Sequence, residues 1–253
     1  MRTVHEIFTM LDSVAPVTSK LDFDNVGLLA GGAGWQVGSV LLSLDITDDV
    51  IDEAKELGAE LIVSHHPLFF SLKSAASTDP GGAKLVELLS NRISAICMHT
   101  NLDAADGGVN DALAAALWLE DTEPFEPEHI GRIGRLPRRM EMSEFLPFVK
   151  NALKSNGLRY YDAGREVFNV AVGGGSCGGF LEAAVDAGCD TFVTADIKYD
   201  VFLRAAELGV NLIDADHFCT ENTVIPVLAG YIRDAFPDLE VQISRHGQTV
   251  RFI

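Results

Sequence analysis

One arrangement recurs four times in this chain and constrains its fold more than any other feature. Each copy has a helical pattern, a Gly or Asn that can end the helix, an apolar strand, and a His or Asp eight positions after that Gly or Asn. The four pairs are Gly58 and His66, Asn91 and His99, Gly188 and Asp196, and Gly209 and His217. Gly and Asn accept the left-handed conformation that ends many helices. The alternation predicts an α/β fold, with metal-binding side chains at or just past the carboxyl ends of strands, where ligand sites of open α/β sheets lie.

The rest of the chain continues this alternation. Strands are expected at 39–47, 59–64, 92–99 and 166–172, and helices at 47–58, 81–91, 108–119 and from about Thr223. Residues 240–253 are interpreted as a strand pair that turns at His246–Gly247. Residues 120–132 contain two prolines and five acidic residues, a change in composition that indicates a domain boundary. We therefore expect domains at 1–125 and 126–253, with the C-terminal part of the second domain packing back on the first.

Charge and composition exclude several classes of partner. Lys and Arg total 19 against 37 Asp and Glu, so the net charge of −18 argues against an extended nucleic-acid surface or an anionic membrane partner. The four cysteines form no C-x-x-C pair, which is typical of reduced thiols. The sequence has no signal-peptide pattern and no apolar stretch long enough to span a membrane. These features predict a cytoplasmic protein.

Three segments bring together side chains that suit a transition metal. "SHHP" supplies adjacent histidines at the end of an apolar strand, "HTNLDAADGG" adds a histidine and two aspartates, and "DHFCTE" adds a histidine and a glutamate. The residues are His65, His66, His99, Asp103, Asp106, His217 and Glu221. Imidazoles combined with carboxylates suit Zn, Fe, Mn, Co or Ni rather than Ca or Mg alone. Two ions would need a bridging carboxylate, for which Asp103 and Glu221 are the candidates.

A second glycine-rich motif, "GGGSCGG", allows other interpretations. Gly173, Gly175 and Gly178 fit G-x-G-x-x-G after a strand, as in dinucleotide-binding proteins, but that motif alone is weak evidence, and no organic cofactor site is assigned. The backbone of this loop could also hold a phosphate. The third interpretation is a close crossing of a strand and a helix.

Several motifs in order resemble one protein family. "FDNVGLLAG", "SHHPLFF", "HTNLDAADGGVNDALA", "AGCDTFVTADIKY" and "NLIDADHFCTE" are similar to the NGG-interacting-factor-three-like proteins. The resemblance covers nearly the whole chain and corresponds to the short form of the family, which lacks an inserted middle domain. It implies two similar α/β domains with mixed central sheets, a homo-oligomer in the form of a toroidal hexamer, and two divalent transition-metal ions in each chain.

The resemblance also implies which residues bind these ions. Matched motif by motif, the metal ligands are His65, His66, Asp103, His217 and Glu221, with Glu221 bridging the two ions. Which of the paired histidines serves which ion stays open. His99 and Asp196 would lie near the site. Three positions depart from the family pattern, because Phe23 replaces a usual Trp, Asp216 a usual Gly and Asp200 a common His.

The function implied is a dinuclear metal-dependent hydrolase with a small-molecule or nucleotide substrate. Family members described as type 2 GTP cyclohydrolase I homologues suggest GTP, and other metallohydrolase reactions would use the same ligands. Candidate acids or bases are His99, Asp106 and Asp200. The alternative is a protein without catalytic activity that serves as a metal carrier, chaperone or regulatory scaffold.

Overall fold

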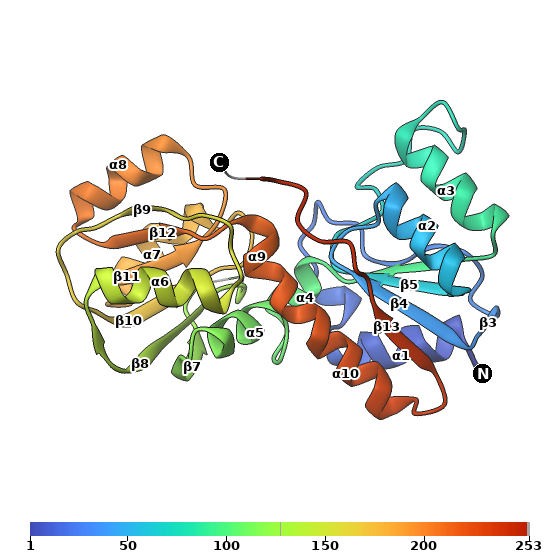
Figure 1. The fold of residues 1–253 in the computed structure, drawn as a ribbon, viewed down its shortest axis with the longest axis horizontal. Coiled ribbons are helices and arrows are strands. Elements are labelled where there is room, and N and C mark those ends of the chain that lie inside the picture. The colour runs from blue at the N-terminus through green and yellow to red at the C-terminus, as the bar shows by residue number, and fades with distance from the viewer. Residues whose placement is uncertain (127, 252–253) are drawn as a thin grey trace. The chain divides into compact units, whose positions relative to one another are not determined.

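The computed structural model describes residues 1–126 and 128–251, and the chain divides into two compact units (Figure 1). The first unit contains residues 1–105 and 225–247, and the second contains 106–224 together with the residues after 247. This division differs from the expected boundary after residue 125. Residues 106–124 belong to the second unit because their helix contributes Leu113 and Ala114 to its core and their strand joins its sheet.

The first unit is built on a five-stranded sheet in the order β13-β4-β5-β6-β2. Its strands are β4 (Ser39–Ser43), β5 (Leu61–Ser64), β6 (Ser94–Cys97), β13 (Glu240–Ile243) and the antiparallel β2 (Gly27–Ala30). A small antiparallel pair joins β1 (Arg2–Thr3) to β3 (Gln36–Val37). All residues of β4, β5 and β6 are buried, as expected for parallel strands covered on both faces.

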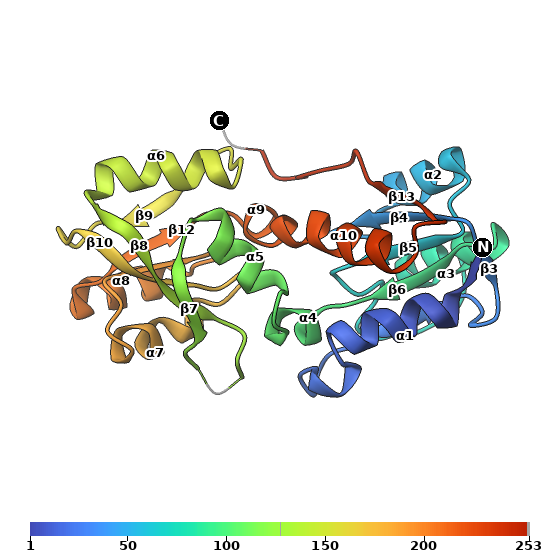
Figure 2. The same ribbon diagram turned by 90° about the horizontal axis from the view of Figure 1, so that it is seen from below.

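Helices cover both faces of this sheet. They are α1 (Val4–Val14), η1 (Val17–Ser19), α2 (Asp48–Leu57), α3 (Pro80–Ser90), α4 (Thr100–Ala104) and α10 (Ile225–Ala235). Helices α2 and α3 pack on one face through Ile51 and Leu88, which contact the strand residues Leu41, Ile62 and Ala95. Helices α1 and α10 pack against each other at the other face (Figure 2).

The ends of these helices follow local sequence rules, with one exception. Thr47 caps α2 by accepting a hydrogen bond from the Val50 amide, and Gly58 ends the helix with φ +66°, as predicted. The left-handed turn expected at Asn91 is wrong by one position. Asn91 has φ −97°, and Arg92 takes the left-handed conformation with φ +57°.

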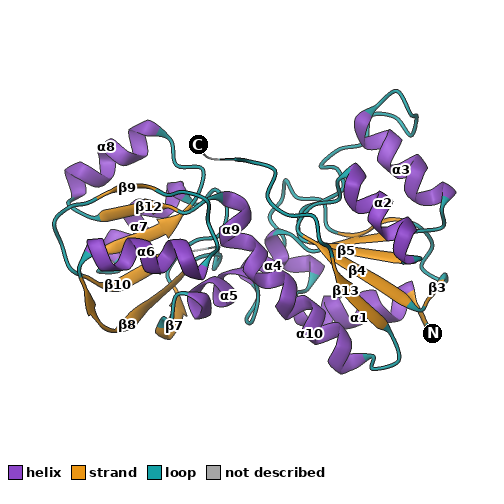
Figure 3. Ribbon diagram, viewed as in Figure 1, coloured by secondary structure: helices purple, strands orange, loops and turns teal. Residues whose placement is uncertain are grey.

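The second unit has a six-stranded sheet in the order β7-β8-β10-β11-β12-β9. Its elements are β7 (Glu120–Pro124), β8 (Arg132–Met140), β9 (Arg159–Tyr161), β10 (Val167–Val172), β11 (Thr191–Thr194), β12 (Asn211–Asp214), α5 (Val109–Ala116), α6 (Met142–Ala152), η2 (Gly178–Phe180), α7 (Leu181–Asp186), α8 (Tyr199–Leu208), α9 (His217–Glu221) and η3 (Asn222–Val224). Strands β10, β11 and β12 are parallel, and β7, β8 and β9 are antiparallel to their neighbours. Each unit therefore combines helices with a mixed sheet (Figure 3), which confirms the predicted fold class.

The strand pair predicted at His246–Gly247 is wrong. Strand β13 instead pairs in parallel with β4, so that Glu240 lies opposite Ser39. Residues 244–251 form no strand. The hydroxyl of Ser244 and the amide of Arg245 donate hydrogen bonds to the buried carboxylate of Glu53, which fixes the chain after the strand without a hairpin.

The four recurring segments end as the sequence predicts. Strands β5, β6 and β11 end two positions before His66, His99 and Asp196, and β12 ends three positions before His217. The candidate metal-binding side chains therefore follow the carboxyl ends of parallel strands in both units. Within residues 1–126 and 128–251, no helix has the length and apolar character needed to cross a bilayer.

Candidate metal centre

Three histidines of the first unit form a cluster where β5 and β6 end. The ring centroids of His65 and His66 are 5.0 Å apart, and the ring of His99 lies 5.2 Å from the first and 5.6 Å from the second. One nitrogen of each ring lies within 4.8 Å of the nitrogens of the other two. His65 is fully buried, and the other two are partly exposed.

Each ring in this cluster is oriented by an acceptor at its Nδ1 atom. The contacts are His65 with the Met98 carbonyl at 2.9 Å, His66 with Asp45 Oδ1 at 2.7 Å, and His99 with Asp24 Oδ1 at 2.9 Å. A carbonyl oxygen can only accept, so the proton of neutral His65 is on Nδ1, and a carboxylate favours the same tautomer in the other two rings. The lone pair of each neutral ring is then on Nε2, the arrangement found in metal-binding histidines.

The carboxylate of Asp24 is itself fixed from several directions. It accepts hydrogen bonds from His99 Nδ1, from the Thr100 amide at 3.0 Å and from the Thr100 hydroxyl at 2.5 Å. Burial alone would raise the pKa of Asp24, but these hydrogen bonds outweigh it and hold the pKa well below its usual range. Asp24 is therefore ionised and can hold the ring of His99 in one orientation.

Asp103 is the carboxylate of the first unit nearest to His65. It lies in α4 and is almost fully buried, and its Oδ1 atom is 3.7 Å from His65 Nε2. Two ligand atoms bound about 2.1 Å from one ion are about 3.0–3.4 Å apart at octahedral or tetrahedral angles. The separation of these two atoms is close to that range and is longer than an ordinary hydrogen bond.

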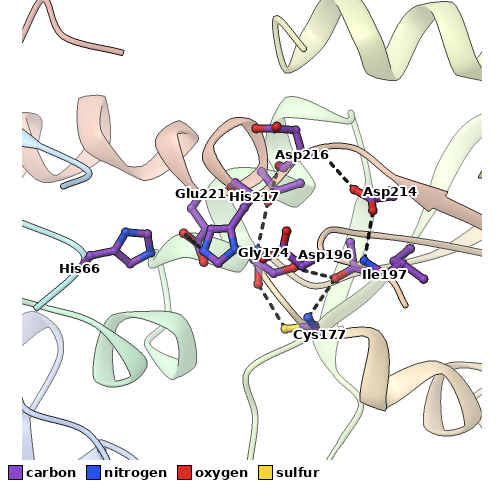
Figure 4. A network of polar contacts seen from close by, with 12 residues as sticks. His66, Gly174, Cys177, Asp196, Ile197, Asp214, Asp216, His217 and Glu221 are labelled. Carbon is purple, nitrogen blue, oxygen red and sulfur yellow. Dashed lines mark hydrogen bonds and ion pairs between the residues drawn. The ribbon is translucent and has the colours of Figure 1, made fainter. Parts of the chain in front are cut away.

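The second unit presents a histidine and a glutamate from one turn of helix. His217 and Glu221 are four positions apart in α9, and His217 Nε2 lies 3.0 Å from Glu221 Oε2. The Nδ1 atom of His217 contacts Asp196 Oδ2 at 2.7 Å (Figure 4). The Nδ1 atom of His217 therefore contacts an oxygen acceptor, as it does in the three histidines of the first unit.

The glycine-rich loop passes so close to Glu221 that side chains on the loop would collide with the glutamate. A Cβ atom added to Gly175 would lie 2.1 Å from Glu221 Oε1, and one added to Gly174 would lie 3.2 Å from Glu221 Cγ. Gly175 also has φ +65°, a conformation that favours glycine. The Gly174 amide donates to Asn110 at 2.7 Å and the Gly175 amide donates to Thr220 at 3.0 Å. The loop thus fits the interpretation of a close crossing, because these amides already bind protein groups.

A strained turn precedes His217. Asp216 has φ +78°, which is unusual for a residue with a side chain. Its carboxylate caps α9 by accepting from the Cys219 amide at 3.2 Å. Asp214, two positions earlier, accepts from the Asp216 amide at 3.3 Å and from the Ile197 amide at 3.1 Å (Figure 4). Two carboxylates therefore organise the backbone on either side of the histidine.

Two further candidates from the sequence lie on the surface of the second unit. The side chain of Asp106 is fully exposed, with Oδ1 3.9 Å from Arg132 Nη2. Asp200 is exposed in the first turn of α8. A role for either residue as an acid or base stays a prediction.

Sequence reasoning did not single out the carboxylates Asp24 and Asp45 as site residues. A signal for Asp45 was present, because it stands two positions after β4, as His66 stands two positions after β5. Asp45 precedes His66 by 21 residues, and Asp196 precedes His217 by the same 21 residues. In both units, the carboxylate that follows one parallel strand orients the histidine that follows the next.

The chain matches a known family. The family described as Duf34/NIF3 (NGG1p interacting factor 3) matches residues 2–249, so the chain belongs to this family. A Clostridium perfringens protein named "GTP cyclohydrolase 1 type 2 homolog" is 34% identical, with 97% of each chain covered.

Solved structures show the same fold. A Bacillus cereus protein related to NIF3 has a TM-score of 0.94 at 24% identity and covers 100% of this chain and 99% of its own. A Staphylococcus aureus hypothetical protein has a TM-score of 0.91 at 27% identity, with 99% of each chain covered. The family and the fold expected from the sequence motifs are therefore confirmed.

Proposed function

We propose that the chain is a metal-dependent hydrolase with a dinuclear centre. The residues that would hold the ions are His65, His66, Asp103, His217 and Glu221, with Glu221 as the carboxylate that would be shared between them. The observation that carries this proposal is the orientation of the histidines, since each Nδ1 atom is held by a carbonyl or a carboxylate. A histidine that only fills space in a core needs no such contact. In a metal-binding histidine, the contact at Nδ1 directs the Nε2 lone pair toward the metal and raises the basicity of the imidazole.

The donor set decides which metals fit. Three imidazole nitrogens and two carboxylates favour Zn, Fe, Mn, Co or Ni over Ca or Mg. Asp103 and Glu221 are both almost fully buried, and a buried carboxylate is costly unless a cation or hydrogen bonds compensate it. Two divalent ions would supply that compensation.

Hydrolysis would divide the work between the ions and the protein. Two divalent ions, when bound, would supply a water of lowered pKa and polarise the substrate atom that this water attacks. His99, Asp106 and Asp200 are the proposed sources and acceptors of protons. His99 suits this role best, because Asp24 holds its Nδ1 proton and leaves Nε2 to exchange a proton with a substrate.

We propose GTP as the substrate, because curated relatives carry the name GTP cyclohydrolase 1 type 2 homolog. The reaction would be the addition of water at C8 of guanine, opening of the five-membered ring, and release of formate by a second water. A homohexamer and a cytoplasmic location complete the proposal, and light scattering at micromolar concentration would test the assembly.

The test combines metal content with turnover. We expect about two transition-metal ions per native chain. The variants His66→Ala and Glu221→Gln should lose both the bound metal and the release of formate from GTP. A His5→Ala variant is the matched control, because His5 is exposed on α1. Full metal occupancy in both site variants would refute the ligand set. Two bound ions with no turnover of GTP, cyclic nucleotides or dinucleotides would favour a metal carrier, chaperone or scaffold instead.

A further inference from the structure

Two aromatic rings are exposed beside the histidine cluster of the first unit. Phe23 is 66% exposed and Phe70 is 57% exposed, and their ring centroids are 6.4 Å apart at an angle of 43°. The ring of Phe70 also meets the ring of His99 edge to face, with the centroids 5.7 Å apart. Removing large apolar side chains from water lowers the free energy of the system. An exposed pair next to polar site residues therefore indicates a binding surface.

The two loops that carry these rings are connected to each other and to the site. The side-chain amide of Asn25 donates to the Phe69 carbonyl at 2.8 Å, which joins the loop at 22–25 to the loop at 67–70. Phe23 directly precedes Asp24, the carboxylate that orients His99. The aromatic pair is therefore held in place by the same segments that build the histidine cluster.

A cavity with an excess of positive charge adjoins the second loop. It has a volume of about 350 Å³ and is lined by Leu68, Phe69, Ser71, Lys73, Asp79, Pro80, Gly81 and Lys84. Two of these side chains are ammonium groups, in a chain whose net charge is −18. The single carboxylate, Asp79, is engaged in capping α3 through the Gly82 amide at 2.9 Å. Lys84 donates to the Ile46 carbonyl at 2.7 Å, which fixes its ammonium group at the wall of the cavity.

The occupant that fits both features is a small molecule with two chemically different parts. A pair of exposed rings tilted by 43° suits a planar ring as its partner, because aromatic and heteroaromatic rings stack on or tilt against each other at such distances. Lysine ammonium groups and a serine hydroxyl suit an anion such as a phosphate. Phe69 lines the cavity and its chain neighbour Phe70 belongs to the exposed pair, so both features lie on the loop at 67–70.

We propose that Phe23 and Phe70 hold the heteroaromatic ring of a phosphorylated substrate beside His99, and that Lys73 and Lys84 bind its phosphate group. This inference rests on the proposed function, since it assigns the substrate of that site to a phosphorylated heteroaromatic compound. Phe23 and Phe70 would then determine specificity for the ring, and the lysines would determine specificity for the anionic group.

Titration calorimetry on the full chain tests this assignment with three probes. The probes are GTP, guanosine and inorganic triphosphate, each measured on metal-loaded protein and on protein treated with a chelator. We expect Phe70→Ala and Phe23→Ala to weaken the binding of GTP and guanosine by about tenfold or more, the usual scale of one lost stacking contact. Lys73→Met should weaken GTP and triphosphate but leave guanosine unchanged. Phe70→Tyr should retain guanosine binding, and Tyr199→Ala, which removes an exposed ring on α8, is the control.

Each other outcome has a defined meaning. Unchanged guanosine affinity in Phe70→Ala, in protein that carries its metals and melts normally, would refute the inference and leave the metal proposal intact. Guanosine binding that depends on Phe70 in a protein that holds no metal would support the inference and refute the proposed hydrolase. A change in oligomeric mass in Phe23→Ser or Phe70→Ser would show that the rings lie between subunits, which would overturn the assignment.

Discussion

The two units present the proposed metal ligands in different ways. In the first unit, His65, His66 and His99 stand one or two positions after a strand, and each ring is oriented by a group from another segment. In the second unit, His217 and Glu221 lie on one turn of helix, and a glycine loop leaves the space that the glutamate occupies. Both units orient a histidine through a carboxylate, and the second unit depends in addition on the absence of side chains beside Glu221.

This difference concerns how each unit fixes the position of its proposed ligands. An orienting carboxylate can be lost while the ring remains close to its place. A side chain inserted where the glycine loop passes Glu221 cannot be accommodated without moving the glutamate or the loop. We therefore expect substitutions in the loop of the second unit to have larger effects than substitutions of the orienting carboxylates.

The largest effect is expected for Gly175→Ala. The new Cβ atom would lie 2.1 Å from Glu221 Oε1, so the carboxylate or the loop must shift. We expect metal content to fall and the free energy of unfolding to drop by about 2–4 kcal/mol, the sum of a left-handed alanine and an overpacked contact. Thermal denaturation and elemental analysis would measure both.

Gly209→Ala is the matched control for this prediction. Gly209 has the same φ of +65°, but a Cβ atom there would meet no atom within 4 Å. It should cost about 1 kcal/mol for the left-handed conformation alone and leave metal content unchanged. Equal effects of the two substitutions would show that the close approach to Glu221 is not what positions the glutamate.

A smaller effect is expected when the orienting carboxylates are removed. Asp45→Ala and Asp196→Ala should each lower metal affinity by about 10–100-fold, the usual range for an outer partner of a metal-binding histidine. The loss should be larger for Asp196, because His217 is the one imidazole that the second unit supplies to the proposed ligand set. Competition with a chromogenic chelator would give the affinities.

Asparagine at the same two positions is the informative comparison. The variants Asp45→Asn and Asp196→Asn are expected to retain part of the metal affinity, since the amide oxygen of asparagine can still accept a hydrogen bond from Nδ1. If the alanine variants bound metal as tightly as the native chain, the orientation of the rings would have no part in metal binding.

The smallest effect is expected for Asp216→Gly. Relief of the strain at φ +78° should raise the free energy of unfolding by about 1–2 kcal/mol. Loss of the cap should lower it by a few tenths of a kcal/mol, and the flexibility of glycine in the unfolded chain should lower it by up to about 1 kcal/mol. The net gain of about 0.5 kcal/mol corresponds to a rise of about 1–2 °C in melting temperature. Asp216→Ala keeps the strain and loses the cap, so it should melt below the native chain, and a lower melting temperature for the glycine variant would contradict this account.

The sequence predicted the strand ends well because they follow from local rules. Gly58 and Gly209 end helices with a left-handed residue, and apolar strands then lead to His66 and His217. The orienting contacts were harder to predict, because they depend on which segments meet in space. Asp24 and His99 are separated by 75 residues, and no local pattern connects them.

The division into units was also beyond local reasoning. A helix with apolar residues such as Leu113 can pack against any apolar surface, so its sequence alone does not say which sheet it covers. The change in composition at 120–132 was interpreted as a boundary, but that segment includes β7, which pairs with β8 inside the second unit.

The parallel pairing of β13 with β4 has a consequence for the order of folding. The first unit is interrupted in the chain by the second, and β4 lacks this neighbour until residues 240–243 have been synthesised. At a translation rate of about 5–20 residues per second, the edge of β4 stays unpaired for on the order of ten seconds. An unpaired strand edge can template association with other chains, so nascent molecules are most prone to aggregation in that interval. The second unit, whose sheet comes from one continuous stretch, can complete its own sheet before the ribosome reaches β13.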